Sequence, residues 1–277
     1  MEQITDWAAL WRQLVEVRED RYRGEGKSGG DAWKERARGF HQKVMQRWTQ
    51  PDSSRDFLLD QVDGGTTFLD VGAGTGAWTL HMARKAQHVT AVDPSPAMLE
   101  ILRENIDAAG LQNVSVVHAA WPDADVKPHD VTLCAHAMYG TADLPCFVER
   151  LMEVTRRRCC LLMRAPLKDG VMSIAAQRIW GQPHDSPNFV IAYNVLLQMG
   201  IYPNVLMENT GEWGAWTSPT LEDAFLETKR KLGLGADSTY DAFLQDLLAE
   251  RLTWSDDHYV WPPSMRSALV YWDVPVK

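Results

Sequence analysis

The chain has 277 residues, of which 45% are hydrophobic and 23% are charged, so its composition is that of a globular protein and excludes a disordered or fibrous chain. Its formal net charge of −9 argues against a nucleic-acid partner, because phosphate binding requires clustered Lys and Arg. No apolar run exceeds five residues, so we expect no membrane span. Four cysteines without a CxxC pair and an N-terminus unlike a secretory signal predict a cytoplasmic protein with no metal site.

Residues 1–62 are expected to form a helical cap. Apolar residues over 4–15 recur at spacings of three and four, which is typical of one face of a helix. The segment 24–30 contains four glycines and predicts a loop. A second helix is expected over 31–48 and a third over 53–62.

Residues 1–48, with the first two of these helices, are the candidate lid over a ligand site, and the second helix supplies its large apolar side chains. The apolar stripe of the second helix includes Trp33 and Phe40, which are large enough to cover a cleft and are candidate substrate contacts. The glycine-rich loop before it would act as the joint, because glycine accepts backbone changes at low steric cost. Residues 21–48 contain eight Lys or Arg and three Asp or Glu. This local charge is consistent with a solvated helix face, an anionic acceptor or an RNA backbone.

Residues 66–164 alternate between short apolar strands and helices. Five strands are expected, over residues 67–71, 89–93, 114–117, 131–135 and 159–163. Because strands joined by helices form a parallel sheet that is covered on both faces, ligands should bind at the carboxyl ends of the strands. The basic run from Arg156 to Arg158 is expected to end the last helix of this region, where cations complement the helix dipole.

Residues 165–277 are less regular. Helices are expected over 170–180, 187–199, 219–232 and 238–251, and late strands over 204–208 and 267–272. Helices between the two late strands would form an insertion at about residues 213–257. Tyr193 and Trp213 are candidate substrate contacts from this part of the chain.

The strongest chemical motif is LDVGAGTGA at 69–77, a glycine-rich turn between a strand and a helix. Such a turn lets a ligand approach the backbone, and the helix N-terminus favours a carboxylate or phosphate. The pattern satisfies the dinucleotide fingerprint GxGxxG/A, with Asp93 at the distance of a ribose ligand, so an NAD-dependent oxidoreductase is one interpretation. Asp70 beside the turn disfavours a pyrophosphate and favours the ammonium group of an amino acid.

With VTAVDPSPAML at 89–99, VVHAAWPD at 116–123 and HDVTLCAHAMYG at 129–140, this motif resembles the class I S-adenosylmethionine-dependent methyltransferases. The resemblance implies an α/β fold, with a Rossmann-like, doubly wound seven-stranded sheet whose last strand is antiparallel. Residues 63–277 would form this methyltransferase domain, preceded by the helical cap and carrying the late helical insertion. The implied cofactor is S-adenosyl-L-methionine, with S-adenosyl-L-homocysteine as the product.

The resemblance also assigns roles to residues. Asp70 and the glycine-rich turn would hold the methionine moiety, and Asp93 would accept hydrogen bonds from both ribose hydroxyls. Ala120 and Trp121 would meet the adenine, although this chain lacks the acidic residue that many members of the family carry there. His136 would lie near the sulfonium. The candidate cofactor-binding residues are therefore Asp70, Gly72, Ala73, Gly74, Gly76, Asp93, Pro94, Ser95, Met98, Ala120, Trp121 and His136.

Methyl transfer from a sulfonium is an in-line displacement, so the protein must align the acceptor, exclude water and, where required, accept a proton. His136 and Tyr139 are the candidate catalytic residues, because they follow the fourth expected strand, and Arg164 follows the fifth. The sequence predicts a methyltransferase for a small-molecule acceptor. The alternatives are an RNA or protein methyltransferase that uses the basic 21–48 segment, and a non-catalytic S-adenosylmethionine-binding protein.

Overall fold

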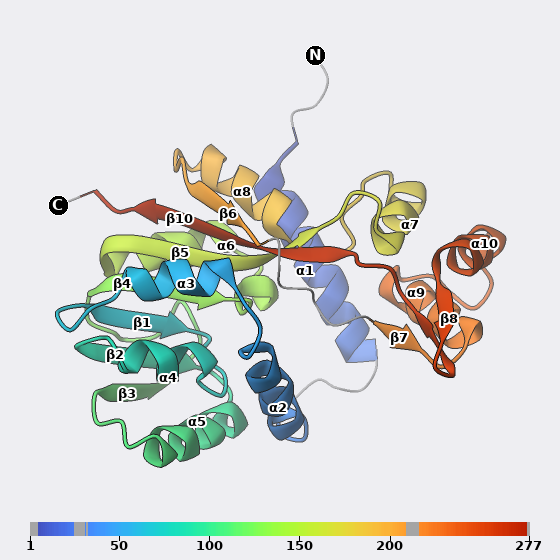
Figure 1. Cartoon of the computed structure of the whole chain (residues 1–277). Helices are drawn as coiled ribbons and strands as arrows, with labels where there is room; N and C mark the ends of the chain where they lie inside the picture. Colours follow the sequence, from blue (N-terminus) through green and yellow to red (C-terminus); the bar gives the residue numbers. More distant parts are fainter. Residues whose placement is uncertain (1–4, 25–30, 32, 209–215, 276–277) are drawn as a thin grey trace.

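A computed structural model describes residues 5–24, 31, 33–208 and 216–275, and its centre is one seven-stranded sheet (Figure 1). The strand order is β3-β2-β1-β4-β5-β10-β6. The strands of this sheet are β1 (Thr67–Val71), β2 (His88–Asp93), β3 (Val114–His118), β4 (His129–Ala135), β5 (Thr155–Pro166), β6 (Asn204–Met207) and β10 (Met265–Asp273). Strand β10 lies antiparallel between β5 and β6, and the pairs from β3 to β5 are parallel. The predicted doubly wound sheet with an antiparallel last strand is confirmed.

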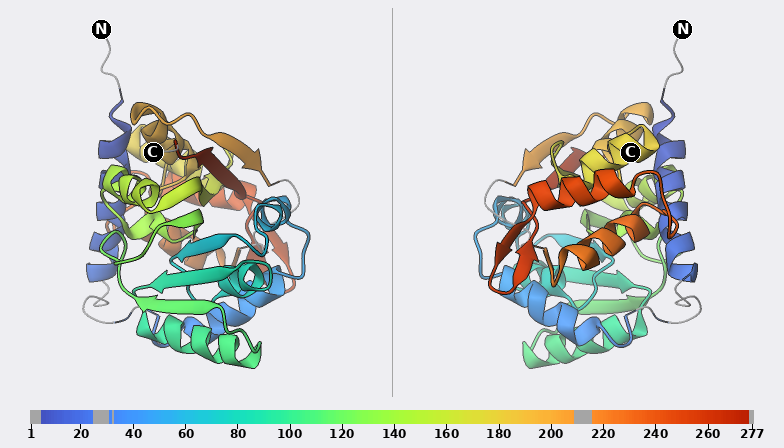
Figure 2. Two further views of the ribbon diagram at one scale, coloured as in Figure 1. Left: turned by 90° about the vertical axis from the view of Figure 1, so that its left-hand side faces the viewer. Right: turned by 90° about the vertical axis from the view of Figure 1, so that its right-hand side faces the viewer.

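Helices cover both faces of this sheet, so the domain has three layers (Figures 1 and 2). Successive strand residues point to opposite faces, so Phe68 packs in one core cluster and Leu69 in another. The Phe68 side carries α3 (Ser53–Asp60), α4 (Ala77–Ala83) and α5 (Pro96–Ala108). The Leu69 side carries α1 (Trp7–Gly24), α6 (Leu144–Glu153) and α8 (Phe189–Gln198).

Helix α1 is part of the main core. Trp11, Leu14 and Val15 are buried in the cluster that also holds α6 and α8 residues. The Trp11 indole N–H donates to the carbonyl oxygen of Thr141 at 2.7 Å. Burial of this apolar stripe fixes the helix to the sheet, so α1 cannot serve as the moving part of a lid without opening the core.

Trp11→Phe is expected to lower the free energy of unfolding by roughly 1–3 kcal/mol, because the part-buried Thr141 carbonyl would lose its hydrogen-bond donor, the indole N–H of the fully buried Trp11. Trp254→Phe is the matched control, since Trp254 is 54% exposed on β8 (Thr253–Ser255). Urea denaturation followed by circular dichroism would measure both variants. Equal effects of the two substitutions would show that α1 contributes no more to the core than an exposed position does.

Helix α2 (Ala37–Arg47) lies at the carboxyl ends of the strands. It is shorter than the helix predicted over 31–48, because residues 33–36 form a turn. The Asp31 carboxylate accepts from the Trp33 N–H at 3.0 Å, which favours a turn at this point. From residue 25 on, the glycine-rich loop predicted over 24–30 lies outside the described part of the chain.

The insertion between β6 and β10 contains a small sheet as well as the predicted helices. Helices α9 (Leu221–Lys231) and α10 (Asp241–Arg251) pack with α7 (Val171–Trp180) around a core of their own. Strands β7 (Thr217–Ser218), β8 and β9 (His258–Val260) pair in the order β7-β9-β8. With two or three residues each, these strands are too short to show the alternation that identifies longer ones.

The prediction that the basic run from Arg156 to Arg158 ends a helix is wrong. These residues lie in β5, and α6 ends at Glu153. Arg158 pairs with Asp273 of β10 at 2.7 Å, so partners across the sheet compensate this charge. In the described part of the chain, no helix is both long enough and apolar enough to cross a bilayer.

Candidate functional site

The glycine-rich turn follows β1 directly and wraps over the end of β2. The Gly72 and Ala73 N–H groups donate to the Val92 carbonyl at 2.8 and 3.0 Å. Gly72 has φ +75°, which only glycine adopts readily, and a Cβ there would overlap the Ala137 side chain. Ala137 follows β4, so the glycine fixes the turn against the end of the neighbouring strand.

Asp93 closes this turn from the end of β2. Its Oδ2 accepts from the Gly74 N–H and its Oδ1 from the Ser95 N–H, each at 2.8 Å. The residue is 7% exposed, and burial raises the pKa of its carboxyl above the ordinary value, although the two backbone N–H groups oppose that shift. Asp93 thus offers a rigidly held carboxylate beside the turn, as a ribose requires.

Asp70 lies beneath the turn and is 1% exposed. Its Oδ2 accepts from the Thr79 hydroxyl at 2.6 Å. Burial, and then the negative charge of Asp93, raise the pKa of Asp70 to about 7, while the Thr79 hydrogen bond opposes the shift. This carboxyl changes its charge near neutral pH, so a cationic group bound close to it would favour the ionised form.

Without a bound ligand, the protein should lose stability as pH rises from about 4 to 7, because folded Asp70 holds its proton where the unfolded chain has released it. Asp70→Asn should remove this slope and raise the free energy of unfolding by at least about 1.4 kcal/mol at pH 8. Asparagine can still accept from Thr79 through its carbonyl oxygen. Urea titrations at pH 5 and pH 8 would measure the effect. A slope that persists in the variant would exclude Asp70 as its source.

Asp31 is a site residue that the sequence did not indicate. Its carboxylate accepts from the Ser95 hydroxyl at 2.8 Å and from the Ala97 N–H at 3.0 Å. Burial acts to raise the pKa of Asp31, but the Ala97 and Trp33 N–H groups and the Ser95 hydroxyl outweigh it and lower the pKa. Asp31 joins the segment before α2 to the start of α5, beside Asp93. Only its position after a glycine-rich loop could have suggested this.

The turn before α2 and the helix itself place the predicted contacts Trp33 and Phe40 on the side of α5. Their rings lie 4.9 Å apart, and Trp33 packs against the cluster that contains Met98. His41 is hydrogen-bonded to the Thr75 hydroxyl of the glycine-rich turn at 3.0 Å. The structure therefore brings Trp33 next to the predicted cofactor residue Met98, with Phe40 against the Trp33 ring.

Ala120 and Trp121 follow β3 on the same edge of the sheet. The Trp121 indole N–H donates to the Phe147 carbonyl at 3.2 Å, and its ring packs against the main core. The indole N–H is thus engaged within the protein. Stacking or edge contact by the ring is what Trp121 can offer to an adenine.

His136 and Tyr139 lie together at the end of β4. His136 Nδ1 is hydrogen-bonded to the Tyr139 hydroxyl at 3.1 Å, and that hydroxyl accepts from the backbone N–H of Arg164 at 2.6 Å. His136 has φ +56°, a left-handed conformation that non-glycine residues rarely adopt and that concentrates at functional sites. Burial, followed by the cations Arg47 and Arg164, lowers the pKa of His136 to about 3, so its ring is neutral at physiological pH.

The structure places neither of the two remaining candidate substrate residues, Tyr193 and Trp213, at this edge of the sheet. Tyr193 packs beside Phe189 in the main core, with ring centroids 5.6 Å apart. Trp213 lies outside the described residues.

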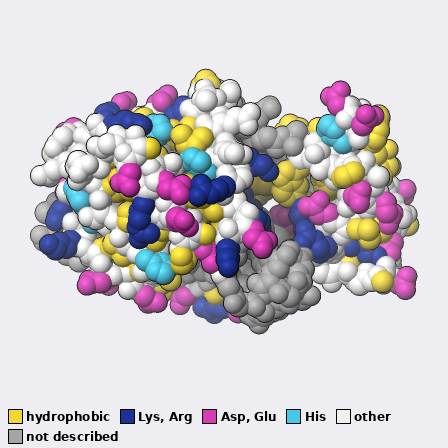
Figure 3. Space-filling model, turned by 90° about the horizontal axis from the view of Figure 1, so that it is seen from below, with side chains coloured by type: hydrophobic (Ala, Val, Ile, Leu, Met, Phe, Trp, Pro, Cys, Tyr) yellow, Lys and Arg dark blue, Asp and Glu magenta, His cyan; other side chains and the backbone are white. Residues whose placement is uncertain are grey.

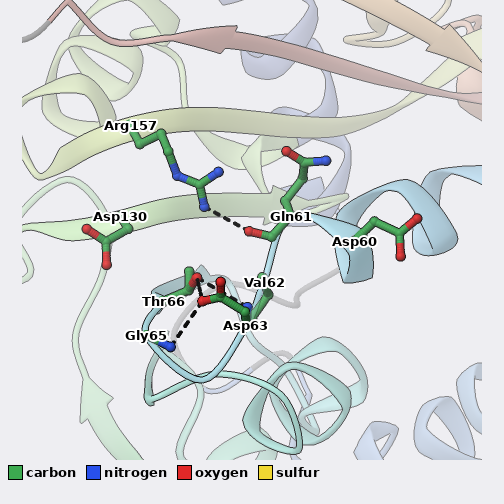
Figure 4. A pocket seen from close by; sticks show the side chains of 8 residues that line it. All are labelled: Asp60, Gln61, Val62, Asp63, Gly65, Thr66, Asp130 and Arg157. Carbon is green, nitrogen blue, oxygen red and sulfur yellow. Dashed lines mark hydrogen bonds between the residues drawn. The ribbon is translucent and has the colours of Figure 1, made fainter.

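A hollow in the described part of the chain lies at the opposite edge of the sheet. It measures about 450 Å³ and is lined by residues before β1 and at the starts of β4 and β5 (Figure 4). Asp63, Asp130 and Arg157 are among them, and Arg157 donates to the Gln61 carbonyl at 2.8 Å. The described acidic residues form no group of three or more that could hold a metal ion. Since ligands of such sheets bind at the carboxyl ends of the strands, this hollow is a poor candidate for the active site.

The doubly wound sheet, its glycine-rich turn and the carboxylate at the end of β2 define a domain with a ligand site at the carboxyl ends of the strands. Residues 68–158 match the sequence model of a family described as a methyltransferase domain. This match covers β1 to the start of β5 and agrees with the predicted resemblance to the class I S-adenosylmethionine-dependent methyltransferases.

Individual proteins and a solved structure are similar to parts of this chain. An uncharacterised protein of Haemophilus influenzae is 28% identical over 191 residues, which cover 66% of this chain and 69% of that protein. Demethylmenaquinone methyltransferase of Listeria welshimeri is 34% identical over 104 residues, covering 35% of this chain and 42% of the relative, so the match spans less than half of that enzyme. A crystal structure of geranyl diphosphate C-methyltransferase from Streptomyces coelicolor covers 80% of this chain and 79% of its own, with a TM-score of 0.50 at 10% identity.

Proposed function

We propose that the protein transfers a methyl group from S-adenosylmethionine to a small-molecule acceptor at the carboxyl ends of β1, β2, β4 and β5. The observation that carries the proposal is the position of α2 and the segment before it. Asp31 is bonded to Ser95, His41 to Thr75, and Arg47 to Ser267 of β10 at 3.2 Å. These contacts hold one segment across the edge from α5 to β10, and a covered site favours a small acceptor that can be sequestered from water.

The residues at the edge fit the cofactor. The buried Asp93 carboxylate would accept from the ribose hydroxyls. In the described part of the chain, the Gly72 and Gly74 carbonyl oxygens accept no hydrogen bond and would suit the ammonium group of the methionine moiety. The Gly72 and Gly74 N–H groups are already paired, so the backbone contribution to this moiety would come from carbonyl oxygens.

The bound cofactor would supply an electrophilic methyl group on its sulfonium. His136 and Tyr139 would then position the acceptor, because they lie beside the end of the glycine-rich turn. With a pKa of about 3, His136 is a weak base and serves as a neutral hydrogen-bonding group. Burial raises the pKa of Tyr139, so its hydroxyl keeps its proton at neutral pH. Alignment and exclusion of water are the contributions that this pair can make to the displacement.

The lid role predicted for residues 1–48 is proposed only for α2 and the segment from Asp31, because α1 is held in the core. Here α2 meets the rest of the site through a few polar contacts and the small cluster around Trp33. Few buried contacts are typical of elements that open locally. Opening of this segment would admit the cofactor and the acceptor.

An RNA acceptor is the main alternative, and it depends on the basic segment before β1. Arg38 pairs with Glu104 at 3.0 Å, and Arg47 donates to Ser267, so both cations already have partners. On the face seen in Figure 3, Lys and Arg side chains of the described residues alternate with Asp and Glu. An RNA backbone is best bound by a continuous basic surface, so this arrangement favours the small-molecule proposal.

Incubation with methyl-labelled S-adenosylmethionine and fractionated cell extract tests the proposal. We expect label in the small-molecule fraction, and none above background in the RNA or protein fraction. Label in RNA that disappears with Arg36→Ala and Arg38→Ala would favour the alternative acceptor. Absence of label from all three fractions, in a protein that binds S-adenosylhomocysteine, would favour a non-catalytic role.

A further inference from the structure

The guanidinium of Arg164 has an unusual environment at the end of β5. Its Nε is buried and has no hydrogen-bond partner among the residues that the structure describes. The same described residues include no carboxylate that forms an ion pair with it. A buried guanidinium N–H without an acceptor is unfavourable, because Arg offers five donors and proteins normally satisfy those that are removed from water.

Contacts of Arg164 with its neighbours fix the side chain without using this N–H group. The guanidinium carbon lies 4.0 Å from the centroid of the Tyr139 ring, so one face of the cation stacks on the aromatic ring. The backbone N–H of Arg164 also donates to the Tyr139 hydroxyl. Stacking uses the face of the guanidinium and leaves the buried Nε–H at its edge for another group.

A second cation approaches the same place from α2. Ser267 of β10 lies opposite Arg164 in the sheet register, and its hydroxyl accepts from Arg47. Both arginines lower the pKa of His136, so both are close to the predicted acceptor side of the site. The negative charges of Asp52 and Glu208 lie close enough to Arg47 to compensate part of its positive charge. Arg164 has no comparable partner among the described carboxylates.

We propose that the methyl acceptor carries an oxyanion, a carboxylate or a phosphate, that binds the edge of the Arg164 guanidinium beside His136 and Tyr139. This inference rests on the proposed function and adds the chemical class of its acceptor. Guanidinium groups bind both kinds of oxyanion through paired N–H donors, and such charge-assisted bonds are stronger than neutral ones. A stacked, preorganised arginine also loses little side-chain entropy on binding.

The first test titrates S-adenosylhomocysteine-saturated protein with inorganic phosphate and, separately, with acetate, by calorimetry. Wild type should bind at least one of the two anions, and Arg164→Gln should weaken that binding by about tenfold or more. Arg178→Gln is the matched control, because Arg178 is exposed on α7, and it should bind as wild type does. Phosphate or acetate binding alone would identify the kind of oxyanion. Equal anion binding by wild type and Arg164→Gln would overturn the proposal.

The second test uses the labelled product. We expect the acceptor activity of the extract to be retained on an anion exchanger, and Arg164→Gln to raise KM for that fraction by tenfold or more while S-adenosylhomocysteine affinity stays within threefold of wild type. Arg164→Lys should recover part of the loss, since it keeps the charge but not the fork of donors. An acceptor that passes the exchanger unretained would refute an anionic acceptor. Failure of wild type to label any fraction would count against the proposed function, whereas the anion titration would still decide the role of Arg164.

Discussion

Gly72→Ala is expected to destabilise the protein by about 3–5 kcal/mol, and the cause is backbone geometry and packing together. The residue has φ +75°, where an L side chain is strained, and its new Cβ would overlap the Ala137 side chain. Relief of the overlap requires the turn after β1 to move away from the end of β4. Both the stability of the domain and the cofactor site depend on this contact.

Gly74→Ala is the matched control for this prediction. Gly74 also has a positive φ, +55°, but a Cβ there would meet no atom within 4 Å. The control therefore has the backbone strain without the overlap, and we expect its free energy of unfolding to fall by about 1–2 kcal/mol. Chemical denaturation of the two variants would separate the contributions. Losses of the same size would contradict a packing role for the Gly72–Ala137 contact.

Asp93→Ala is expected to weaken S-adenosylhomocysteine binding by about 100-fold or more, because it removes the charged acceptor of the ribose hydroxyls. The substitution also leaves the Gly74 and Ser95 N–H groups without their acceptors, which disorganises the turn. Asp93→Asn is not conservative here, since one amide oxygen cannot serve both N–H donors and the amide nitrogen would face a donor.

Asp107→Ala is the control for Asp93→Ala, because Asp107 is an exposed carboxylate on α5. Its affinity for S-adenosylhomocysteine should stay within twofold of wild type. Circular dichroism would establish that both variants are folded, and calorimetry would give the affinities. Wild-type affinity in a folded Asp93→Ala protein would show that the cofactor does not bind at the end of β2.

Most residues proposed for the cofactor could be predicted from the sequence because they are local. Residues 69–98 run through β1, the turn, α4, β2 and the start of α5, and the register between β1 and β2 brings Asp70 and Asp93 to one edge. Alternating strands and clear helix caps, such as Ser95 before Pro96, specify this part of the fold. The prediction of seven strands with an antiparallel last strand came from the resemblance to a known family.

The acceptor side could not be predicted in the same way, because its residues are far apart in sequence. Arg47 and Ser267 are hydrogen-bonded although 220 positions separate them, and Asp31 meets Ser95 across 64 positions. No local pattern encodes such pairs. The Arg156–Arg158 run was misassigned for a related reason: three consecutive cations suggest a helix end. In the strand, Arg156 pairs with Asp130 of β4, Arg157 donates to the Gln61 carbonyl after α3, and Arg158 pairs with Asp273 of β10.

Calorimetric titration with S-adenosylhomocysteine, and in parallel with NADH, tests the central claim that the carboxyl edge of this sheet is a methyltransferase cofactor site. We expect one S-adenosylhomocysteine site per chain, lost in Asp93→Ala and kept in Asp107→Ala, with no binding of NADH. Binding of NADH as tight as that of S-adenosylhomocysteine, with the same dependence on Asp93, would contradict a methyltransferase site and favour a nicotinamide-dependent enzyme.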